Sequence, residues 1–192
     1  MLNQTYSKTN FLKKQVDIGF DVDKFNSMSY KKDELYYTND GDLELKETVL
    51  IESKNIFSVY TGDVYDLYLS ISEAIKEVCA MYDIDIKKQK YMIYGKMSKY
   101  GPSSNKNWYD FPGVSIPYLH GMCFITGDSY RLSFSNNNIV TKEVFNKNEL
   151  FINKPTDIIN IKTDQENEVV EFYIAPLYAL KHNEPGVWVP II

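Results

Sequence analysis

The sequence predicts a mainly β (α+β) protein, with a β-sandwich or jelly-roll core that carries one clear amphipathic helix. Three observations predict this fold class. Short runs of alternating apolar and polar residues recur along the chain, polar turn sequences separate them, and one stretch has helical spacing. We expect a single β-rich domain over residues 16–175, an extended arm before it at 1–15 and an irregular, proline-rich tail after it at 176–192.

The strand predictions follow the stretches in which apolar and polar residues alternate. Two such stretches open the domain, and the turn-forming residues Asn39-Asp40-Gly41-Asp42 lie between them. Further stretches follow the helix and are bounded by residues that are typical of turns. The connection that opens at Asn136 is interpreted as one long loop. We therefore expect strands over residues 16–25, 43–60, 91–95, 116–126, 130–135, 157–163 and 169–174.

One segment, at about residues 63–82, has the apolar spacing of an amphipathic helix. Its apolar residues recur three and four positions apart, and charged residues such as Glu73 and Lys76 occupy the other face. Either Thr61 or Asp63 would cap its first turn. The side chains that we expect this helix to bury are Val64, Leu67, Tyr68, Ile71, Ala74, Ile75, Val78 and Tyr82.

The two ends of the chain differ in composition from the domain between them. Residues 1–15 carry few large apolar side chains, so we expect an extended arm there instead of a helix or an alternating strand. The tail contains Pro176, Pro185 and Pro190. Because proline cannot donate to an interior ladder of hydrogen bonds, we expect this tail to be irregular.

Charge and apolar content limit the partners of the chain. The formal net charge is −5 at pH 7, and Arg131 is the one arginine, so the side chain that most often contacts bases and phosphates is nearly absent. The apolar runs are far shorter than the roughly 20 residues that cross a bilayer, and residues 1–5 lack the pattern of a signal peptide. We expect a soluble protein that contacts neither a membrane nor a specific nucleic-acid sequence.

The two cysteines, Cys79 and Cys123, are not paired at a spacing that is typical of metal or redox sites. Each lies in an apolar periodic segment, where a free thiol behaves as a small hydrophobic group. We therefore expect two buried free thiols.

The candidate metal ligands are the two histidines, His120 and His182, both in the β-rich half of the chain. Before them come the amphipathic helix, a tyrosine-rich strand that ends at Gly95, and a loop. Over about residues 64–184 this order resembles the iron- and 2-oxoglutarate-dependent dioxygenases. The resemblance implies a jelly roll in which two histidines and a carboxylate bind iron.

The sequence departs from the pattern of that family at two places. Met122 stands two residues after His120, where the family has a metal-binding carboxylate, and no arginine follows His182 at the spacing that would bind the co-substrate. A carboxylate would have to come from Asp128 or Glu184. The alternative interpretation is that both histidines are structural, and on this interpretation the chain binds no metal and no cofactor.

A second candidate site is the aromatic loop that contains Trp108, Tyr109 and Phe111. Such residues, beside Pro112-Gly113, could form an exposed binding loop for a sugar or a protein surface. The alternative is that the loop packs against the sandwich.

Composition and organisation together predict a role in assembly. The chain is rich in Asn, Ile, Lys and Tyr, as in AT-rich genomes, and it contains no recognisable catalytic motif. In this composition, and in having an arm, a compact β core and a tail, it resembles virion proteins of tailed bacteriophages, such as neck, head–tail connector or tail-completion subunits. The resemblance implies a ring of identical copies that contacts other virion proteins.

The functional expectation is therefore a non-enzymatic structural subunit, located in the virion after assembly in the host cytoplasm. Two alternatives stay open. One is a metal-dependent, oxygenase-like jelly-roll enzyme or its inactive relative, with His120 and His182 as metal ligands. The other is a small phage protein that binds the host's defence machinery.

Overall fold

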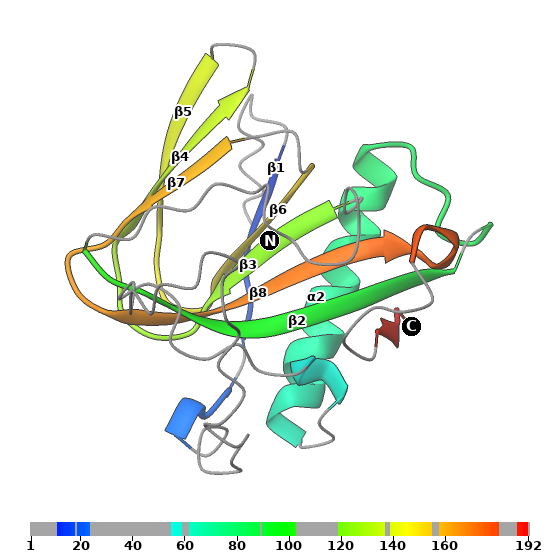
Figure 1. The fold of residues 1–192 in the computed structure, drawn as a ribbon, viewed down its shortest axis with the longest axis horizontal. Coiled ribbons are helices and arrows are strands. Elements are labelled where there is room, and N and C mark those ends of the chain that lie inside the picture. The colour runs from blue at the N-terminus through cyan, green and yellow to red at the C-terminus, as the bar shows by residue number, and fades with distance from the viewer. Residues whose placement is uncertain are drawn as a thin grey trace, which may run out of the picture.

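Two antiparallel β-sheets make up most of the computed structural model, which describes residues 11–17, 19–23, 55–58, 62–88, 90–102, 119–136, 139–154, 158–180 and 188–191. The large sheet has the strand order β1-β6-β3-β8-β2-β9, and the small sheet has the order β5-β4-β7. Within the described ranges the prediction of a mainly β sandwich of jelly-roll type is confirmed (Figure 1). The strands are β1 (Phe11–Gln15), β2 (Tyr91–Tyr100), β3 (Leu119–Phe124), β4 (Tyr130–Asn136), β5 (Ile139–Phe145), β6 (Glu149–Asn153), β7 (Ile158–Lys162), β8 (Asn167–Pro176) and β9 (Val189–Pro190).

The helix α2 (Gly62–Met81) lies along one face of the large sheet, and the small sheet lies away from it (Figure 1). Its apolar residues repeat at helical spacing, so one stripe of the helix is apolar and packs on the sheet. The helix prediction is confirmed, because seven of the eight expected side chains are buried and Tyr82 is partly buried against the same cluster. None of the described helices has the length and apolar character needed to cross a membrane.

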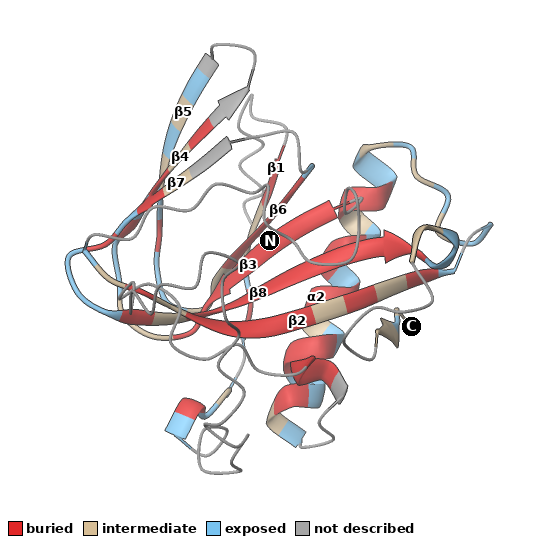
Figure 2. Cartoon of the chain, in the orientation of Figure 1, coloured by how far each residue is buried: buried red, intermediate tan, exposed pale blue. Residues whose placement is uncertain are grey.

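The large sheet buries both of its faces, in two separate hydrophobic clusters. Because successive side chains of a strand point to opposite faces, β3 contributes Leu119 and Cys123 to the cluster against the helix and Met122 and Phe124 to the cluster between the sheets. We call these the helix-side core and the inter-sheet core. Burial is concentrated on β3, β8 and the sheet-facing stripe of α2, whereas β5 carries exposed residues (Figure 2).

Close packing at the centre of the large sheet requires a glycine at position 121. A Cβ atom added to Gly121 would lie 2.3 Å from Cζ of Phe172 and 2.5 Å from the backbone oxygen of Phe151. No side chain fits there without moving the Phe172 ring and the backbone of β6. The centre of β3 is therefore a point of direct contact between the backbone and the helix-side core.

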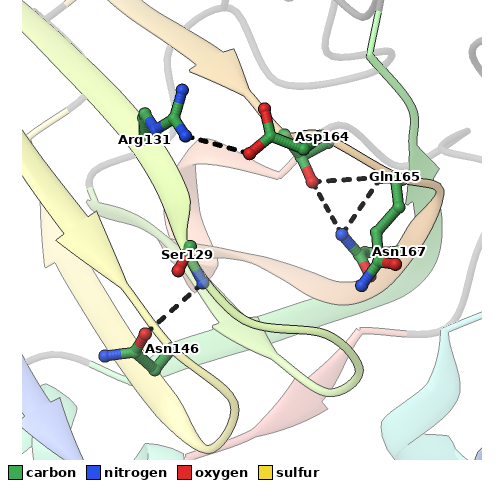
Figure 3. Close-up of polar contacts among 7 residues, drawn as sticks. Ser129, Arg131, Asn146, Asp164, Gln165 and Asn167 are labelled. Carbon is green, nitrogen blue, oxygen red and sulfur yellow. Dashed lines mark hydrogen bonds and ion pairs between the residues drawn. The ribbon is translucent and has the colours of Figure 1, made fainter.

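Polar contacts fix the turns at one end of the sandwich (Figure 3). The buried side chain of Asn167 donates hydrogen bonds from Nδ2 to Oγ1 of Thr163 at 2.7 Å and to the carbonyl oxygen of Gln165 at 3.1 Å. Gly127 has a φ of +69°, and a Cβ there would lie 1.9 Å from Oδ1 of Asn167. The exposed pair Arg131–Asp164, at 2.9 Å, joins the same two connections from the outside.

The first strand closes the side of the sandwich. The ring of Phe11 stacks on Phe134 of the small sheet with centroids 4.4 Å apart. Lys13 donates a hydrogen bond from Nζ to the carbonyl oxygen of Val144 at 2.7 Å and lies over the ring of Phe145. The N-terminal strand of the large sheet is thus in contact with residues of the small sheet that are far from it in the sequence.

Five sequence predictions are corrected by these elements. Residues 11–15, expected in an extended arm, form β1, whereas the described residues of 16–25 form no strand and those of 43–60 include the 3₁₀ helix η1 (Ile56–Ser58). The loop expected after Asn136 contains β5 and β6. The tail at 176–192 is partly regular, because η2 (Leu177–Ala179) and β9 lie in it. Residues 1–10 and the Asn39–Asp42 turn lie outside the described ranges.

The remaining differences are in length. Strands expected at 91–95 and 169–174 extend to ten residues each, as β2 and β8. They pair along their whole length, from Tyr91 opposite Pro176 to Tyr100 opposite Asn167. This pair is the longest ladder of the sheet, and it carries most of the residues discussed next.

Candidate functional site

A cluster of polar side chains lies on the inter-sheet face of the large sheet, where the strands otherwise bury apolar residues. Along β8, Val170, Phe172 and Ile174 point to the helix-side core, so Glu171 and Tyr173 point between the sheets. Along β2, Ile93 and Met97 likewise belong to the helix-side core. We define the polar cluster as Tyr94, Lys96, Tyr100, His120, Asn153, Glu171 and Tyr173.

The register of four strands places these residues in two neighbouring rows. In one row Tyr94 is opposite Tyr173, Tyr173 is opposite His120, and His120 is opposite Asn153. In the next row Lys96 is opposite Glu171, Glu171 is opposite Met122, and Met122 is opposite Phe151. Directly opposed residues on one face have Cβ atoms roughly 5 Å apart, so each row is a chain of side-chain contacts.

Glu171 is the centre of the cluster, and its side chain is fully buried. Its carboxylate accepts a hydrogen bond from the hydroxyl of Tyr100 at Oε1 and another from Tyr173 at Oε2, the latter at 2.8 Å. Nζ of Lys96 lies 4.0 Å from Oε2. Burial, and secondarily the negative charge of Glu171, raises the pKa of Tyr100 well above its usual value. Tyr100 therefore stays a neutral hydrogen-bond donor.

His120 is buried at the end of the first row, between two aromatic rings. Its ring lies 5.1 Å from that of Tyr173 and 5.9 Å from that of Phe151, centroid to centroid. Nδ1 lies 3.3 Å from Oδ1 of Asn153, whose Nδ2 donates to the carbonyl oxygen of Lys154 at 2.9 Å. Because Asn153 presents its oxygen to the ring, Nδ1 of His120 is the donor in this contact.

Lys96 on β2 forms the outer end of the second row. The side chain of Lys96 retains 11% exposure, whereas that of Glu171 on the next strand has none. Beside Lys96 on the same face, the ring of Tyr94 contacts Trp188 of the C-terminal segment at a centroid distance of 5.7 Å. Tyr94 and Trp188 are both partly exposed. Lys96 and Tyr94 thus lie at the β2 end of the cluster, and Glu171 lies one strand further in.

Of the residues that the sequence singled out, His120 belongs to this cluster. Met122 is fully buried in the inter-sheet core, and Cys123 points to the helix-side core, as the alternation predicted. Both Cys79 and Cys123 are buried free thiols, as expected. Asp128 is exposed in the turn beyond β3 and accepts a hydrogen bond from the backbone N–H of Lys147 at 3.5 Å. His182, Glu184, Trp108, Tyr109 and Phe111 lie outside the described residues.

The described residues do not fit the iron site that the sequence resemblance implies. Across the described ranges, no group of three or more His, Cys, Asp or Glu side chains gathers so as to hold a metal. The thioether of Met122 is a soft ligand, and Fe²⁺ sites of this type require a carboxylate. The carboxylate beside it, Glu171, already accepts hydrogen bonds from two tyrosines.

Glu171, Lys96, Tyr100 and Tyr173 were not predicted from the sequence to belong to a functional site. One signal was present: Glu171 interrupts the run from Val169 to Ile174, in which every other residue is apolar or aromatic. A charged residue at an interior position of such a strand is expected to have a buried partner. The identity of that partner depends on strand pairing, which the sequence does not supply.

Comparisons with known proteins give a likeness of fold. No protein-family model matches the chain, and no curated protein matches it. A Pseudomonas putida prolyl-4-hydroxylase is similar in structure, with 8% identity, 61% of this chain and 70% of that chain covered, and a TM-score of 0.43. A 2OG-Fe(II) oxygenase family oxidoreductase from Burkholderia pseudomallei is similar over 86% of this chain and 84% of that one, with 8% identity and a TM-score of 0.46.

A third similar structure is a formate complex of Lactobacillus farciminis oxalate decarboxylase. Its identity to this chain is 14%, the TM-score is 0.35, and the match covers 50% of this chain and 28% of that one. At such identities a structural likeness speaks of fold alone. The function of this chain is therefore inferred below from its own residues.

Proposed function

We propose that this protein is a jelly-roll protein that binds a small carboxylate between its two sheets, through the polar cluster. The observation that supports the proposal is a charged and hydrogen-bonded set buried on a face that is apolar elsewhere. Glu171 has no exposure, Lys96 has 9% and His120 has 1%. On the same face, the rest of the inter-sheet core is built of aromatic and aliphatic side chains.

Stability alone does not account for such a set. Replacing a buried ion pair by apolar residues of similar size is often neutral or stabilising by about 1–4 kcal/mol. The neighbouring residues Phe124 and Phe151 show that this sheet can fill the space with aromatic rings. Retained polar residues in an otherwise apolar core are therefore a reason to infer a binding role. The space between the sheets is also where jelly-roll proteins hold ligands.

The chemistry of the cluster favours an anionic ligand. Lys96 carries a positive charge, and Tyr94 and Asn153 carry further hydrogen-bond donors, whereas the hydroxyl of Tyr173 already donates to Glu171. The one carboxylate of the cluster, Glu171, already accepts from two tyrosine hydroxyls. At the β2 end of the cluster, beside the partly exposed Tyr94, a small carboxylate could be bound by the Lys96 ammonium and the tyrosine hydroxyl.

The proposal is tested by titrating the purified protein with 2-oxoglutarate and with succinate, and by following the melting temperature and the heat of binding. Glucose serves as a neutral probe. Ligands that bind only the folded state stabilise it by about 2.7 kcal/mol at 100 times the dissociation constant, so a dose-dependent rise in Tm is expected for a carboxylate. Glucose is expected to give none.

Two variants of neighbouring lysines make the test specific. Lys96→Met removes the positive charge of the cluster. Lys99→Met removes a positive charge on the same strand, from a lysine that pairs with Glu166 and Glu168 outside the cluster. We expect Lys96→Met to abolish the carboxylate-dependent rise and Lys99→Met to retain it. Equal responses of the two variants, or no response of the wild-type protein, would refute the proposal.

A second candidate function is assembly with further copies of the chain, as the sequence resemblance to virion subunits implies. Exposed apolar side chains favour it: Val140 and Val144 of β5 are 57% and 49% exposed, and Tyr178 after β8 is 76% exposed. Such residues are enriched where protein surfaces meet. Native mass spectrometry at micromolar concentration decides this question. A protein that stays monomeric at every concentration would exclude the assembly role.

A further inference from the structure

We infer that the ammonium group of Lys96 supplies, between the sheets of this protein, the positive charge that a metal ion supplies in metal-dependent jelly rolls. The inference rests on the proposed function for the location of the site. It goes beyond it by assigning to one side chain the charge at that site, and by making the site independent of metal.

The position of Lys96 carries the first step. Lys96, Glu171 and Met122 occupy one cross-strand row on the inter-sheet face, in that order from the edge of the sheet. Met122 is the residue that replaces the metal-binding carboxylate in the sequence pattern. The carboxylate of this row is therefore Glu171, on the strand β8 next to Met122. The residue opposite Glu171 on its other side is Lys96 of β2.

The burial of Glu171 carries the second step. An ionised carboxylate without exposure requires compensation by opposite charge and by hydrogen bonds, because desolvation of the charge costs several kcal/mol. Tyr100 and Tyr173 supply the hydrogen bonds, and Lys96 at 4.0 Å supplies the charge. Two hydroxyl groups and one ammonium group thus surround Glu171, and the ammonium occupies the role that the cation has beside a metal-site carboxylate.

Met122 carries the third step. Its side chain is fully buried and packs with the apolar residues of the inter-sheet core. A hydrated divalent cation beside Glu171 would have to displace this thioether or accept it as a soft, uncharged ligand. The row is therefore complete as a lysine–carboxylate pair without a metal.

The first test is the metal dependence of the wild-type protein. It is dialysed against Fe(II) under anaerobic conditions, and separately against Mn(II), and its metal content is measured by mass spectrometry. We expect far less than one metal per chain and no change in melting temperature with EDTA or with either metal. Stoichiometric binding, with loss of the metal in His120→Ala, would overturn the inference.

The second test removes the pair one residue at a time. Lys96→Met leaves Glu171 buried without its counter-charge and is expected to lower the melting temperature by about 10 °C. In the double variant Lys96→Met/Glu171→Met no charge is left to compensate, so most of the loss is expected to be recovered. A double variant that is as unstable as the sum of the two single variants would contradict the pairing.

The two tests separate this inference from the proposed function. A wild-type protein that holds no metal and shows the recovery in the double variant, but does not bind 2-oxoglutarate or succinate, would refute carboxylate binding and leave the role of Lys96 intact. A protein that binds the carboxylates only together with Fe(II) or Mn(II) would support carboxylate binding and refute the role of Lys96.

Discussion

Glu171 and Met122 are directly opposed across the β8–β3 pair, and both side chains lie between the two sheets. The residue that the sequence placed at a metal-binding position is thus apolar, and the acidic group lies on the neighbouring strand. Each of the two side chains is fully buried. The polar cluster is built around Glu171 at this position. Four predictions test the cluster and the core around it.

The charge of Glu171 is expected to matter more than its shape. In Glu171→Gln the side chain keeps its size, but Lys96 loses its partner, and one of the two tyrosine hydroxyls faces an amide NH₂ in place of an oxygen. We expect a loss of about 3 kcal/mol in the free energy of unfolding, measured by urea denaturation. Glu166→Gln, at an exposed site in the turn before β8, is the control and should change the free energy of unfolding by less than about 0.5 kcal/mol. Equal losses would show that the charge is not compensated locally.

A methyl group at position 121 is expected to be costly. In Gly121→Ala the new Cβ would lie within 2.5 Å of ring atoms of Phe172 and of the Phe151 backbone oxygen, so the ring and the backbone of β6 must shift. Overpacking of this kind costs about 1–3 kcal/mol or more. Gly62→Ala is the matched control, because an added Cβ meets nothing within 4 Å at the start of α2. Thermal unfolding of both variants measures the difference, and similar melting temperatures would contradict the packing at β3.

The turn at the end of the sandwich separates a buried polar contact from an exposed one. Asn167→Ala removes hydrogen bonds to Thr163 and Gln165 and takes a donor away from the buried hydroxyl of Thr163, so a loss of about 1–3 kcal/mol is expected. Arg131→Ala removes an ion pair whose side chains are 61% and 74% exposed. Such pairs contribute about 0–1 kcal/mol. Urea denaturation of the two variants measures both losses; a larger loss for Arg131→Ala would show that the surface pair holds the turn.

The protein is expected to lose stability at alkaline pH. Burial raises the pKa of Cys79 to about 11 and raises the pKa values of Cys123, Tyr130 and Tyr100 further above their usual ranges. Between pH 9 and 11 the unfolded chain therefore releases protons that the folded chain retains. Stability is complete below the unfolded pKa values and falls as pH rises through this window.

Melting temperatures measured from pH 7 to pH 11 test this expectation, with Cys123→Val as the comparison. The variant lacks one buried proton that must be lost on unfolding, so its decline should be shallower. A wild-type melting temperature that stays constant up to pH 11 would be inconsistent with four buried neutral groups.

The sequence supported the helix and the later strands because their signals are local. The apolar spacing of α2 and the alternation in β4 and β7 depend only on neighbouring residues. The strands β5 and β6 were missed because Asn136 and the residues after it look like the start of a loop. The chain instead turns back there, and β5 pairs with β4 from Ile139 onward. The edge strands β1 and β9 were missed because they are short and become regular only by pairing.

The candidate site shows the same division. His120 was found because histidine is rare in this chain and carries recognisable chemistry. Its hydrogen-bond partner Asn153 and the pair formed by Glu171 and Lys96 come from three other strands, and no local pattern links them. Such a site depends on the register between strands far apart in the sequence, which residue spacing does not encode.

The order of strands in the large sheet has a consequence for how the molecule folds. Every pair in that sheet joins distant segments, from Phe11 with Asn153 to Tyr91 with Pro176. A chain that emerges from the ribosome can form α2 early, but the strands β1, β3 and β6 cannot pair beneath the helix until β6 has been synthesised. We therefore expect a slow, late folding step in which the helix waits with its apolar stripe exposed, a stage at which chaperones would have their main opportunity to bind.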